Sequence, residues 1–483
     1  GRMRRAARTL AATAVASSAA AVSALCSTTR DASASPCRES SRLVMVHVIF
    51  RHGARTPVFT ALPQIAELNW SRCSTGRCAD FQLALESSSH VVLNGRPISP
   101  TPVRPHELKD PTSRAPQPPP DIFSQWEHKL GGTCRGGQLT DLGCEQAYSL
   151  GLRLRDAYVG RIPGVGSAWD ERTMRVRSTV VPRCVASAQF ALRGLFPDQD
   201  EDKPIPMGML SFDEESLFPN SRRSERLQEI LAAGRKSWID KPSPEASACA
   251  RHLRSVLDDQ TCAALQVDKC NFIRVRDILV SLVAHDMVIP DCLAPALPSL
   301  DLVDRLATEQ IVRMMSGGGG PGGTSTDLSP EAHRHSLGLF FEEVLADVGR
   351  RVRGETQEAF KLYSAHDTTL LPLLMLLGVF TGPHAVWPGF SSCLAIELHE
   401  LKPLGRNESP GNAQTASEYG VRVMYEFEDI TARVPGCPEH GLCPLPEFRK
   451  AVRECLPSSH LEEGDEHPGA KESLVAGGGM SQF

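Results

Sequence analysis

The chain lacks several features that mark common classes of protein. It carries no basic excess, because its 483 residues include 52 Lys and Arg against 57 Asp and Glu, for a net charge of −5. This balance argues against a nucleic-acid partner, so any site for an anion must be local. Aromatic residues are also few, with five Trp and five Tyr. After the N-terminal thirty or so residues, no segment is apolar enough to span a bilayer.

The cysteines do not follow a metal-binding or redox pattern. Fifteen are present, but none has the CxxC spacing of a zinc ribbon or a redox motif. The close pairs are Cys73/Cys78 and Cys437/Cys443. The second pair lies between Gly and Pro residues in "VPGCPEHGLCPLPEF" and would close a tight disulfide loop in an oxidising compartment. A mitochondrial matrix would keep it reduced, and the sequence leaves both states open.

The two ends of the chain differ in composition from the rest. The first thirty residues hold five Arg, no Lys and no acidic residue, which is typical of a mitochondrial transit peptide. The uncharged stretch from Thr9 to Thr29 leaves open a secretory h-region or a signal anchor, although it is too poor in Leu to favour a stable span. We expect residues 1–36 to be a targeting segment for mitochondria, with the secretory pathway, lysosome or a membrane anchor as the alternative. The polar tail, 457–483, is expected to be disordered.

The order of the predicted elements indicates an α/β core. Short apolar runs rich in β-branched residues predict buried strands at residues 42–50, 173–179, 359–365, 392–400 and 419–429. Apolar residues at helical spacing predict helices that begin after Thr140, near Ser178 or Thr179, and after Asp367. Residues 60–130 are crowded with proline in places and are expected to be irregular.

A long insertion interrupts this core. Residues 198–355 have helical spacing, are broken by prolines and contain no obvious strand. We therefore expect a mostly helical cap at 198–355, inserted into a discontinuous core formed by 37–197 and 356–456. The predicted fold is α/β, with a mixed, mainly parallel central sheet flanked by helices.

Three predicted strands end in polar residues suited to binding an anion. In such sheets, ligands bind outside the carboxyl ends of the strands. These ends carry Arg51-His52, Arg177 and His366-Asp367. If they meet, they form one pocket with Arg55, which follows the first end. Arginine forks match phosphate oxygens and keep their charge at any working pH.

The composition of this pocket favours phosphoryl transfer without a metal. The set contains a single carboxylate, Asp367, so it does not resemble an octahedral metal site, and we expect neither a metal nor a cofactor. An imidazole among several cations has a lowered pKa, so His52 should be neutral and nucleophilic. It could attack phosphorus in line, with Asp367 protonating the departing oxygen and later activating water.

Simpler interpretations of these residues exist. A lone histidine at a strand end is more often a hydrogen-bonded structural residue, and Arg-rich turns are usually solvated. For the third arginine, Arg175 competes with Arg177 because both lie on the same face of the strand, while Arg183 falls in the following helix. A second His-Asp pair, His285-Asp286, lies in a helix-like stretch with no strand before it, so we interpret it as structural.

Four motifs, in this order, resemble the histidine acid phosphatases of the RHGxRxP/HD branch. They are "RHGARTP", "GGQLTDLGCEQAYSLGLRLRDAY", "RVRSTVVPRCVASAQ" and "SAHDTTL". Within this family, "LFPN", "WPGFSSCLAIEL" and "VPGCPEHGLCPLPEF" are similar to the group that acts on lysophosphatidic acid. The resemblance implies an α/β core with a helical cap and mitochondrial residence.

The resemblance also implies roles for the site residues. His52 would be the phosphorylated nucleophile and Asp367 the proton donor. The phosphate would be bound by Arg51, Arg55, Arg177 and His366. The expected activity is metal-independent hydrolysis of a phosphomonoester, with lysophosphatidic acid converted to monoacylglycerol and phosphate.

Two other functions remain open at this point. The first is a broad-specificity acid phosphatase, a phytase-like enzyme or a sugar-phosphate phosphatase. The second is a phosphate-ligand binding module without catalysis, against which the joint presence of His52 and Asp367 argues. We expect a monomer whose partner is a small phosphomonoester, a lysophospholipid by the resemblance, with no nucleic acid and no stable transmembrane span.

Overall fold

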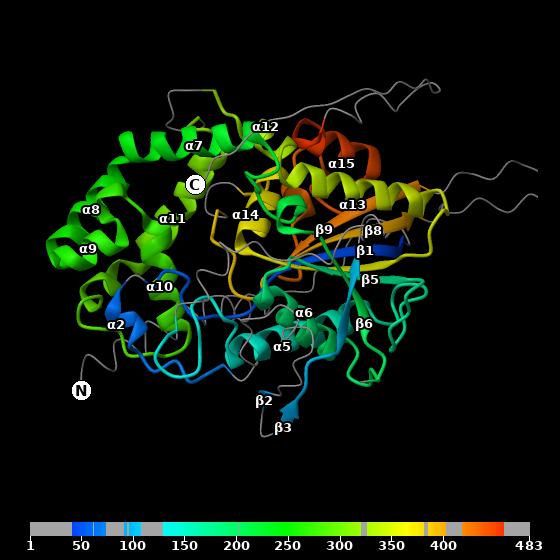
Figure 1. Cartoon of the computed structure of the whole chain (residues 1–483). Coiled ribbons are helices and arrows are strands. Elements are labelled where there is room, and N and C mark those ends of the chain that lie inside the picture. The colour runs from blue at the N-terminus through cyan, green and yellow to red at the C-terminus, as the bar shows by residue number, and fades with distance from the viewer. Residues whose placement is uncertain are drawn as a thin grey trace, which may run out of the picture.

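The protein is described by a computed structural model, shown in Figure 1. The structure describes residues 41–60, 62–73, 91–93, 96–107, 129–200, 202–319, 326–380, 385–401 and 418–457. The predicted targeting segment and all but the first residue of the predicted disordered tail lie outside these residues. Within the described part of the chain, no helix is long and apolar enough to cross a membrane.

A nine-stranded mixed sheet runs through the molecule. Its order is β10-β9-β8-β1-β7-β5-β6-β4, and β11 pairs with β9. The strands are β1 (Ser41–Arg51), β4 (Val103–Glu107), β5 (Met174–Ser178), β6 (Ile205–Met209), β7 (Phe360–Ala365), β8 (Cys393–Leu401), β9 (Glu418–Tyr425), β10 (Glu428–Asp429) and β11 (Cys443–Pro444). Pairing is parallel from β1 through β7, β5 and β6 to β4, and antiparallel on the β8 side. The predicted mixed, mainly parallel sheet is therefore confirmed. A separate hairpin is formed by β2 (Val91–Leu93) and β3 (Arg96–Ile98).

Helices cover both faces of the sheet. On one face lie α5 (Asp141–Tyr158) and α6 (Pro182–Leu195), and on the other α13 (Leu337–Val352), α14 (Asp367–Leu376) and α15 (Leu445–Val452) (Figure 1). The remaining helices gather mainly to the left in Figure 1: α2 (Pro63–Ala66), α7 (Glu225–Asp240), α8 (Pro244–Val256), α9 (Asp259–Leu265), α10 (Phe272–Ala284), α11 (Leu300–Met315) and α12 (Ser329–Arg334). The exact division into core and cap stays a prediction.

Two sequence-based expectations about strands are wrong. Residues 198–355 are not free of strands, because β6 lies in the main sheet between β5 and β4. Its sequence, IPMGM, carries Pro and Gly, which weaken a strand pattern. Residues 60–130 are likewise not wholly irregular, because β4 forms the edge of the sheet, where a proline is tolerated.

The helices behind the site begin where local chemistry allows. Thr140 caps α5, as predicted, and its Oγ1 accepts a hydrogen bond of 3.3 Å from the Gly143 amide. The start predicted for the next helix, at Ser178 or Thr179, is three or four residues too early. Helix α6 begins at Pro182, because proline suits the first helical position and holds the preceding Val181 in an extended conformation.

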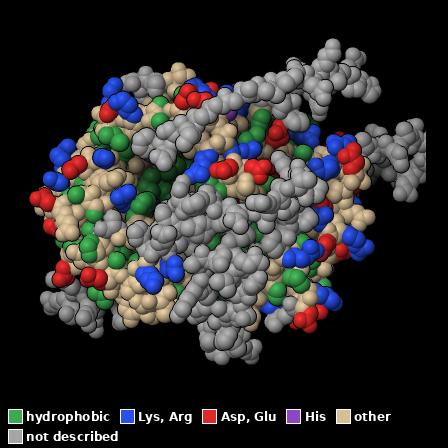
Figure 2. Space-filling model, viewed as in Figure 1, with side chains coloured by type: hydrophobic (Ala, Val, Ile, Leu, Met, Phe, Trp, Pro, Cys, Tyr) green, Lys and Arg blue, Asp and Glu red, His purple; other side chains and the backbone are tan. Residues whose placement is uncertain are grey.

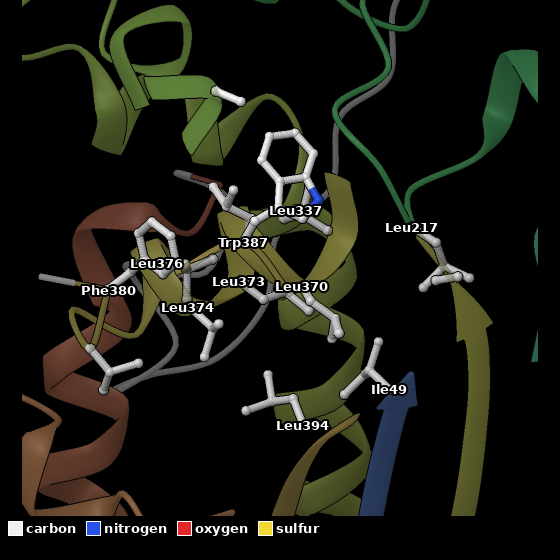
Figure 3. Close-up of a cluster of buried hydrophobic side chains, with 14 of the residues drawn as sticks. Ile49, Leu217, Leu337, Leu370, Leu373, Leu374, Leu376, Phe380, Trp387 and Leu394 are labelled. Atoms are coloured by element: carbon white, nitrogen blue, oxygen red, sulfur yellow. The ribbon is translucent and has the colours of Figure 1, made fainter. Parts of the chain in front are cut away.

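Two hydrophobic cores lie on opposite faces of the sheet. The side chains of β1 point alternately into the two cores, so Ile49 lies in one core and Val48 and Phe50 lie in the other. Figure 3 shows part of the first core, where leucines of α14 lie above Ile49 and Leu394. Because β1 is buried on both faces, the loop after it starts from a rigid strand.

A close backbone contact fixes this loop. A Cβ on Gly53 would lie 2.1 Å from the carbonyl oxygen of Gly143, and a Cβ on Gly143 would lie 2.1 Å from that of Ala54. The amide of Ala54 also donates to Gln146 Oε1 at 2.8 Å. The two glycines therefore let the RHGA turn pack directly on the first turn of α5.

We expect Gly143→Ala to destabilise the protein. The added methyl group has no space, so the first turn of α5 must move away from Ala54, at a cost of about 1–3 kcal/mol in the free energy of unfolding. Urea unfolding curves would measure this. The control is Gly166→Ala, since a Cβ there meets nothing within 4 Å. Equal stability of the two variants would contradict the packing argument.

Candidate functional site

The chain brings two of the predicted strand ends side by side. β1 and β7 are parallel neighbours, and Arg51 is in register with Ala365. The His52 amide donates to the Ala365 carbonyl at 3.0 Å. The residues that follow the two strands, His52 and His366, therefore meet, with ring centroids 5.7 Å apart.

His52 is held in a form suited to nucleophilic attack. Its side chain is 1% exposed, and Nδ1 lies 2.8 Å from the carbonyl oxygen of Gly53. A carbonyl oxygen only accepts, so Nδ1 carries the proton and Nε2 keeps its lone pair in the neutral ring. Burial, followed by the positive charges of Arg183, Arg51 and Arg55, places the pKa of His52 well below its ordinary value. The ring is therefore neutral at acidic as well as neutral pH.

Arg51 and Arg55 border this histidine. Arg51 Nη2 lies 2.8 Å from Asp367 Oδ2, and its Nη1 donates to the Pro388 carbonyl at 2.6 Å. Arg55 Nη1 lies 2.7 Å from Asp277 Oδ1 in α10. Burial lowers the pKa of Arg51 to about 10, which leaves it charged. Residues 198–355 thus contribute directly to the site through Asp277.

The third arginine of the site is Arg183, which the sequence analysis assigned to the helix. After burial, its charge is the strongest influence lowering the pKa of both His52 and His366. Burial lowers the pKa of Arg183 itself to about 10. The signal that could have found it is Pro182, which marks the first position of α6 and so places Arg183 in a helical turn at the carboxyl end of the sheet.

Among the described residues, Arg177 and His52 make no contact with each other. Its Nη2 donates to Glu215 Oε1 at 2.6 Å and to Ser216 Oγ at 2.9 Å, and its Nη1 donates to Glu343 Oε2 at 2.9 Å. The placement of Arg177 in the phosphate pocket is therefore corrected. The physical reason is strand alternation, which points Arg177 at the face covered by α13.

The three site arginines share unsatisfied donors. Within the described residues, the Nε–H groups of Arg51, Arg55 and Arg183 are buried and have no hydrogen-bond partner. A buried donor without a partner costs free energy, so such groups need an explanation. A bound anion with several oxygens, such as a phosphate, would satisfy them.

Asp367 and His366 complete the group at the start of α14. Burial alone would raise the pKa of Asp367, but the charges of Arg51, Arg55 and Arg276 and a hydrogen bond of 3.0 Å from Trp387 Nε1 hold it well below its usual range. Burial and Arg183 lower the pKa of His366 to about 3, and its Nε2 lies 3.1 Å from Thr179 Oγ1. Arg276 and Trp387 are site neighbours that the sequence analysis missed.

The second His-Asp pair lies away from His52. His285 directly follows α10 and is buried. Its Nε2 lies 2.7 Å from Thr140 Oγ1, and its Nδ1 lies 2.7 Å from the Ser281 carbonyl oxygen. Both of its nitrogens are satisfied, in keeping with a structural role. Arg175 pairs with Glu358 at 2.8 Å, so it is not the third site arginine.

The remaining predictions for this region concern metal ligands and disulfides. Within the described ranges, no group of three or more His, Cys, Asp or Glu side chains could hold a metal ion. Cys437 and Cys443 are joined by a disulfide, and so are Cys73 and Cys134. The second disulfide was not predicted, because its partners are 61 residues apart in the sequence.

The chain is similar to several known proteins. The model of the histidine phosphatase superfamily, branch 2, matches residues 42–266. Human lysophosphatidic acid phosphatase type 6 is 27% identical over 424 residues, which cover 86% of this chain and 84% of that protein. Human testicular acid phosphatase is 28% identical over 332 residues, covering 67% and 72%. The solved phytase from Citrobacter braakii aligns with a TM-score of 0.49 at 13% identity, over 86% of this chain and 98% of that one. The chain is thus similar to branch 2 of the histidine phosphatase superfamily over residues 42–266 and, over most of its length, to lysophosphatidic acid phosphatase type 6.

Proposed function

We propose that this phosphatase works through a phosphohistidine at His52, without a metal, and that its substrate is lysophosphatidic acid. The observation that carries the mechanism is that, among the described residues, the buried Nε–H groups of Arg51, Arg55 and Arg183 have no partner, while Nδ1 of His52 is engaged and leaves Nε2 as the nucleophile. These groups supply a place for the phosphoryl oxygens and a nucleophile for phosphorus.

The first step transfers the phosphoryl group. Nε2 of His52 forms a bond to phosphorus while the bond from phosphorus to the ester oxygen breaks. The three arginines stabilise the charge on the non-bridging oxygens, and Asp367 gives a proton to the departing alcohol oxygen. In the second step, water attacks phosphorus, Asp367 takes the proton from this water, and the phosphorus–nitrogen bond breaks to release phosphate.

The substrate must help Asp367 to carry a proton. In the free site, the surrounding arginines keep this carboxyl ionised. A phosphate monoester brings negative charge to the same arginines and so raises the pKa of Asp367. At acidic pH the ester also carries a proton of its own, because its second pKa is about 6. Protonated Asp367 is therefore favoured at acidic pH with substrate bound.

We expect Asp367→Asn to lower kcat/KM, which reports the first step alone, in proportion to how much the leaving group needs a proton. For an alkyl phosphate the loss should be about 10²–10⁴-fold, because the alkoxide is a poor leaving group. For p-nitrophenyl phosphate, whose leaving group needs little protonation, the loss should be about tenfold or less. Asparagine keeps the Oδ1 that accepts from the Thr368 amide at 2.8 Å, so the helix start is preserved. An equal loss on both substrates would rule out Asp367 as the proton donor.

The lipid substrate is supported by likeness and by surface chemistry. The relative that aligns with 86% of this chain is named for lysophosphatidic acid. Figure 2 shows a hollow with hydrophobic side chains between the positions of α11 and α14, and α14 begins at Asp367. Val386 is 57% exposed next to Trp387, whose indole contacts Asp367. An acyl chain would cover such apolar surface. The products would be monoacylglycerol and phosphate.

A turnover panel tests the substrate. We expect kcat/KM to be highest for lysophosphatidic acid among that lipid, phytate and a phosphosugar, and EDTA to leave the rate unchanged. The second candidate is a broad-specificity acid phosphatase, favoured by the likeness to testicular acid phosphatase. Equal turnover of all three compounds would support it, whereas preference for phytate or the phosphosugar would reject the lipid assignment.

The location of the protein is likewise a proposal. The Arg-rich segment 1–36 favours mitochondria, and the secretory pathway is the alternative. The disulfides Cys73–Cys134 and Cys437–Cys443 fit an oxidising compartment, which favours a site outside the mitochondrial matrix. Cell fractionation combined with thiol labelling of the native protein would test both points.

A further inference from the structure

Arg177 is buried between two carboxylates of unequal exposure. Its own side chain is 7% exposed, that of Glu215 is fully buried, and that of Glu343 is 50% exposed. On its outer side, Arg177 lines a polar cavity of about 530 Å³ together with Arg175 and Tyr363. Arg177 therefore neutralises one buried carboxylate from a position at the edge of a cavity.

Glu215 organises the segment that follows it. Its Oε1 accepts from the amides of Ser216 and Leu217, each at 2.9 Å, in addition to Arg177. The side-chain Nδ2 of Asn220 donates to the Glu215 backbone carbonyl at 3.3 Å. The Glu215 carboxylate thus holds together residues 215–218, called the 215–218 segment below.

The 215–218 segment touches the phosphate-site histidine in two ways. The Phe218 ring lies edge-on to His366, with centroids 5.9 Å apart. The Leu217 carbonyl accepts a hydrogen bond from Thr369 Oγ1. Thr369 Oγ1 in turn accepts one from the His366 amide at 3.2 Å. Figure 3 shows Leu217 just beyond the tip of β7, the strand that directly precedes His366.

We propose that Arg177 is a positioning residue of the phosphatase site, acting through Glu215 and the 215–218 segment on His366. This inference rests on the proposed function and on a phosphate-binding role of His366, which the resemblance to the histidine acid phosphatases implies. Arg177 makes no contact with His366 or His52 among the described residues, so its influence travels through the segment. Without Arg177, the Glu215 carboxylate is buried and uncompensated, and the segment must open to hydrate it. His366 then loses its contact with Phe218 and the hydrogen-bonded support at Thr369.

The experiment compares Arg177→Met with Arg175→Met. Arg175 is a matched control, because it lies on the same face of β5, lines the same cavity and pairs with Glu358 at 2.8 Å. The readout is the inhibition constant of inorganic phosphate against p-nitrophenyl phosphate, at a temperature where each variant is folded. We expect binding of phosphate to weaken about 10- to 10²-fold in Arg177→Met. In Arg175→Met the inhibition constant of phosphate should stay within about twofold of wild type, since exposed ion pairs contribute little.

Rescue separates positioning from general stability. In Arg177→Met/Glu215→Gln the uncompensated charge is gone while the acceptor for the two amides remains, so phosphate binding should recover to within about threefold of wild type. A folded Arg177→Met variant that binds phosphate as Arg175→Met does would overturn the proposal, and so would a double variant without recovery.

Two further arms keep the test decisive. If Arg177→Met does not fold, Arg177→Lys replaces it. Lysine keeps the cation for Glu215, so phosphate binding should stay within about threefold of wild type, and a loss of tenfold or more would contradict compensation of Glu215 as the cause. Wild-type protein that fails to hydrolyse p-nitrophenyl phosphate would instead count against the proposed function.

Discussion

Replacing His52 with alanine is expected to lower kcat by about 10⁴-fold or more, because the variant has lost the atom that attacks phosphorus. The remaining arginines would still bind the phosphate, so the inhibition constant of inorganic phosphate should change far less than kcat. Initial rates with p-nitrophenyl phosphate, and competition by inorganic phosphate, would measure the two quantities separately.

A second buried histidine provides the control for this variant. His285 is 2% exposed against 1% for His52, yet both of its nitrogens have protein partners. His285→Ala should therefore lower stability and leave kcat of the folded protein within about threefold of wild type. If His52→Ala retained wild-type kcat while folded, another group would have to be the nucleophile.

Replacing Arg183 with alanine is expected to lower kcat/KM by about 10²–10³-fold, comparable to the loss of one donor to a developing negative charge. The reason is that its buried Nε–H has no partner within the described part of the chain, and that its charge lowers the pKa of both His52 and His366. Arg183→Lys should recover only part of the loss, because lysine keeps the charge but cannot offer a planar fork.

The control for Arg183 lies in the same helix. Arg193 is at the other end of α6, where its Nε donates to the Ser99 carbonyl at 3.0 Å. Arg193→Ala should leave kcat/KM within about threefold of wild type, since a surface substitution away from the site has small effects. Equal losses in the two variants would mean that Arg183 acts through the stability of α6 and not through the phosphoryl group.

Much of this site could be predicted from the sequence because its parts are local. The apolar run before Arg51 and the one before His366 each predict a buried strand that ends in polar residues, and parallel strands bring such ends together. Five of the six residues assigned to the pocket lie together in the structure for this reason. Thr140 as a helix cap was equally local.

The features that could not be predicted from the sequence are set by side-chain direction and by long-range packing. Arg177 and Arg183 are only six residues apart, but strand alternation sends the first towards α13, and a proline-initiated helix carries the second to His52. Asp277 and Trp387 reach the site from distant segments, and no local pattern marks them. Strand β6 was missed because Pro206 and Gly208 hide its pattern.

The most direct test of the phosphohistidine mechanism is to trap the intermediate. Wild-type protein would be mixed with a phosphomonoester, quenched within milliseconds in alkaline denaturant, which preserves phosphohistidine, and digested for mass spectrometry. We expect one added phosphoryl group on the wild-type peptide that contains His52. This group should accumulate in Asp367→Asn when the substrate has a good leaving group, and it should be absent in His52→Ala. A wild-type peptide no more phosphorylated than that of His52→Ala, in a protein that turns over the same substrate, would contradict the mechanism.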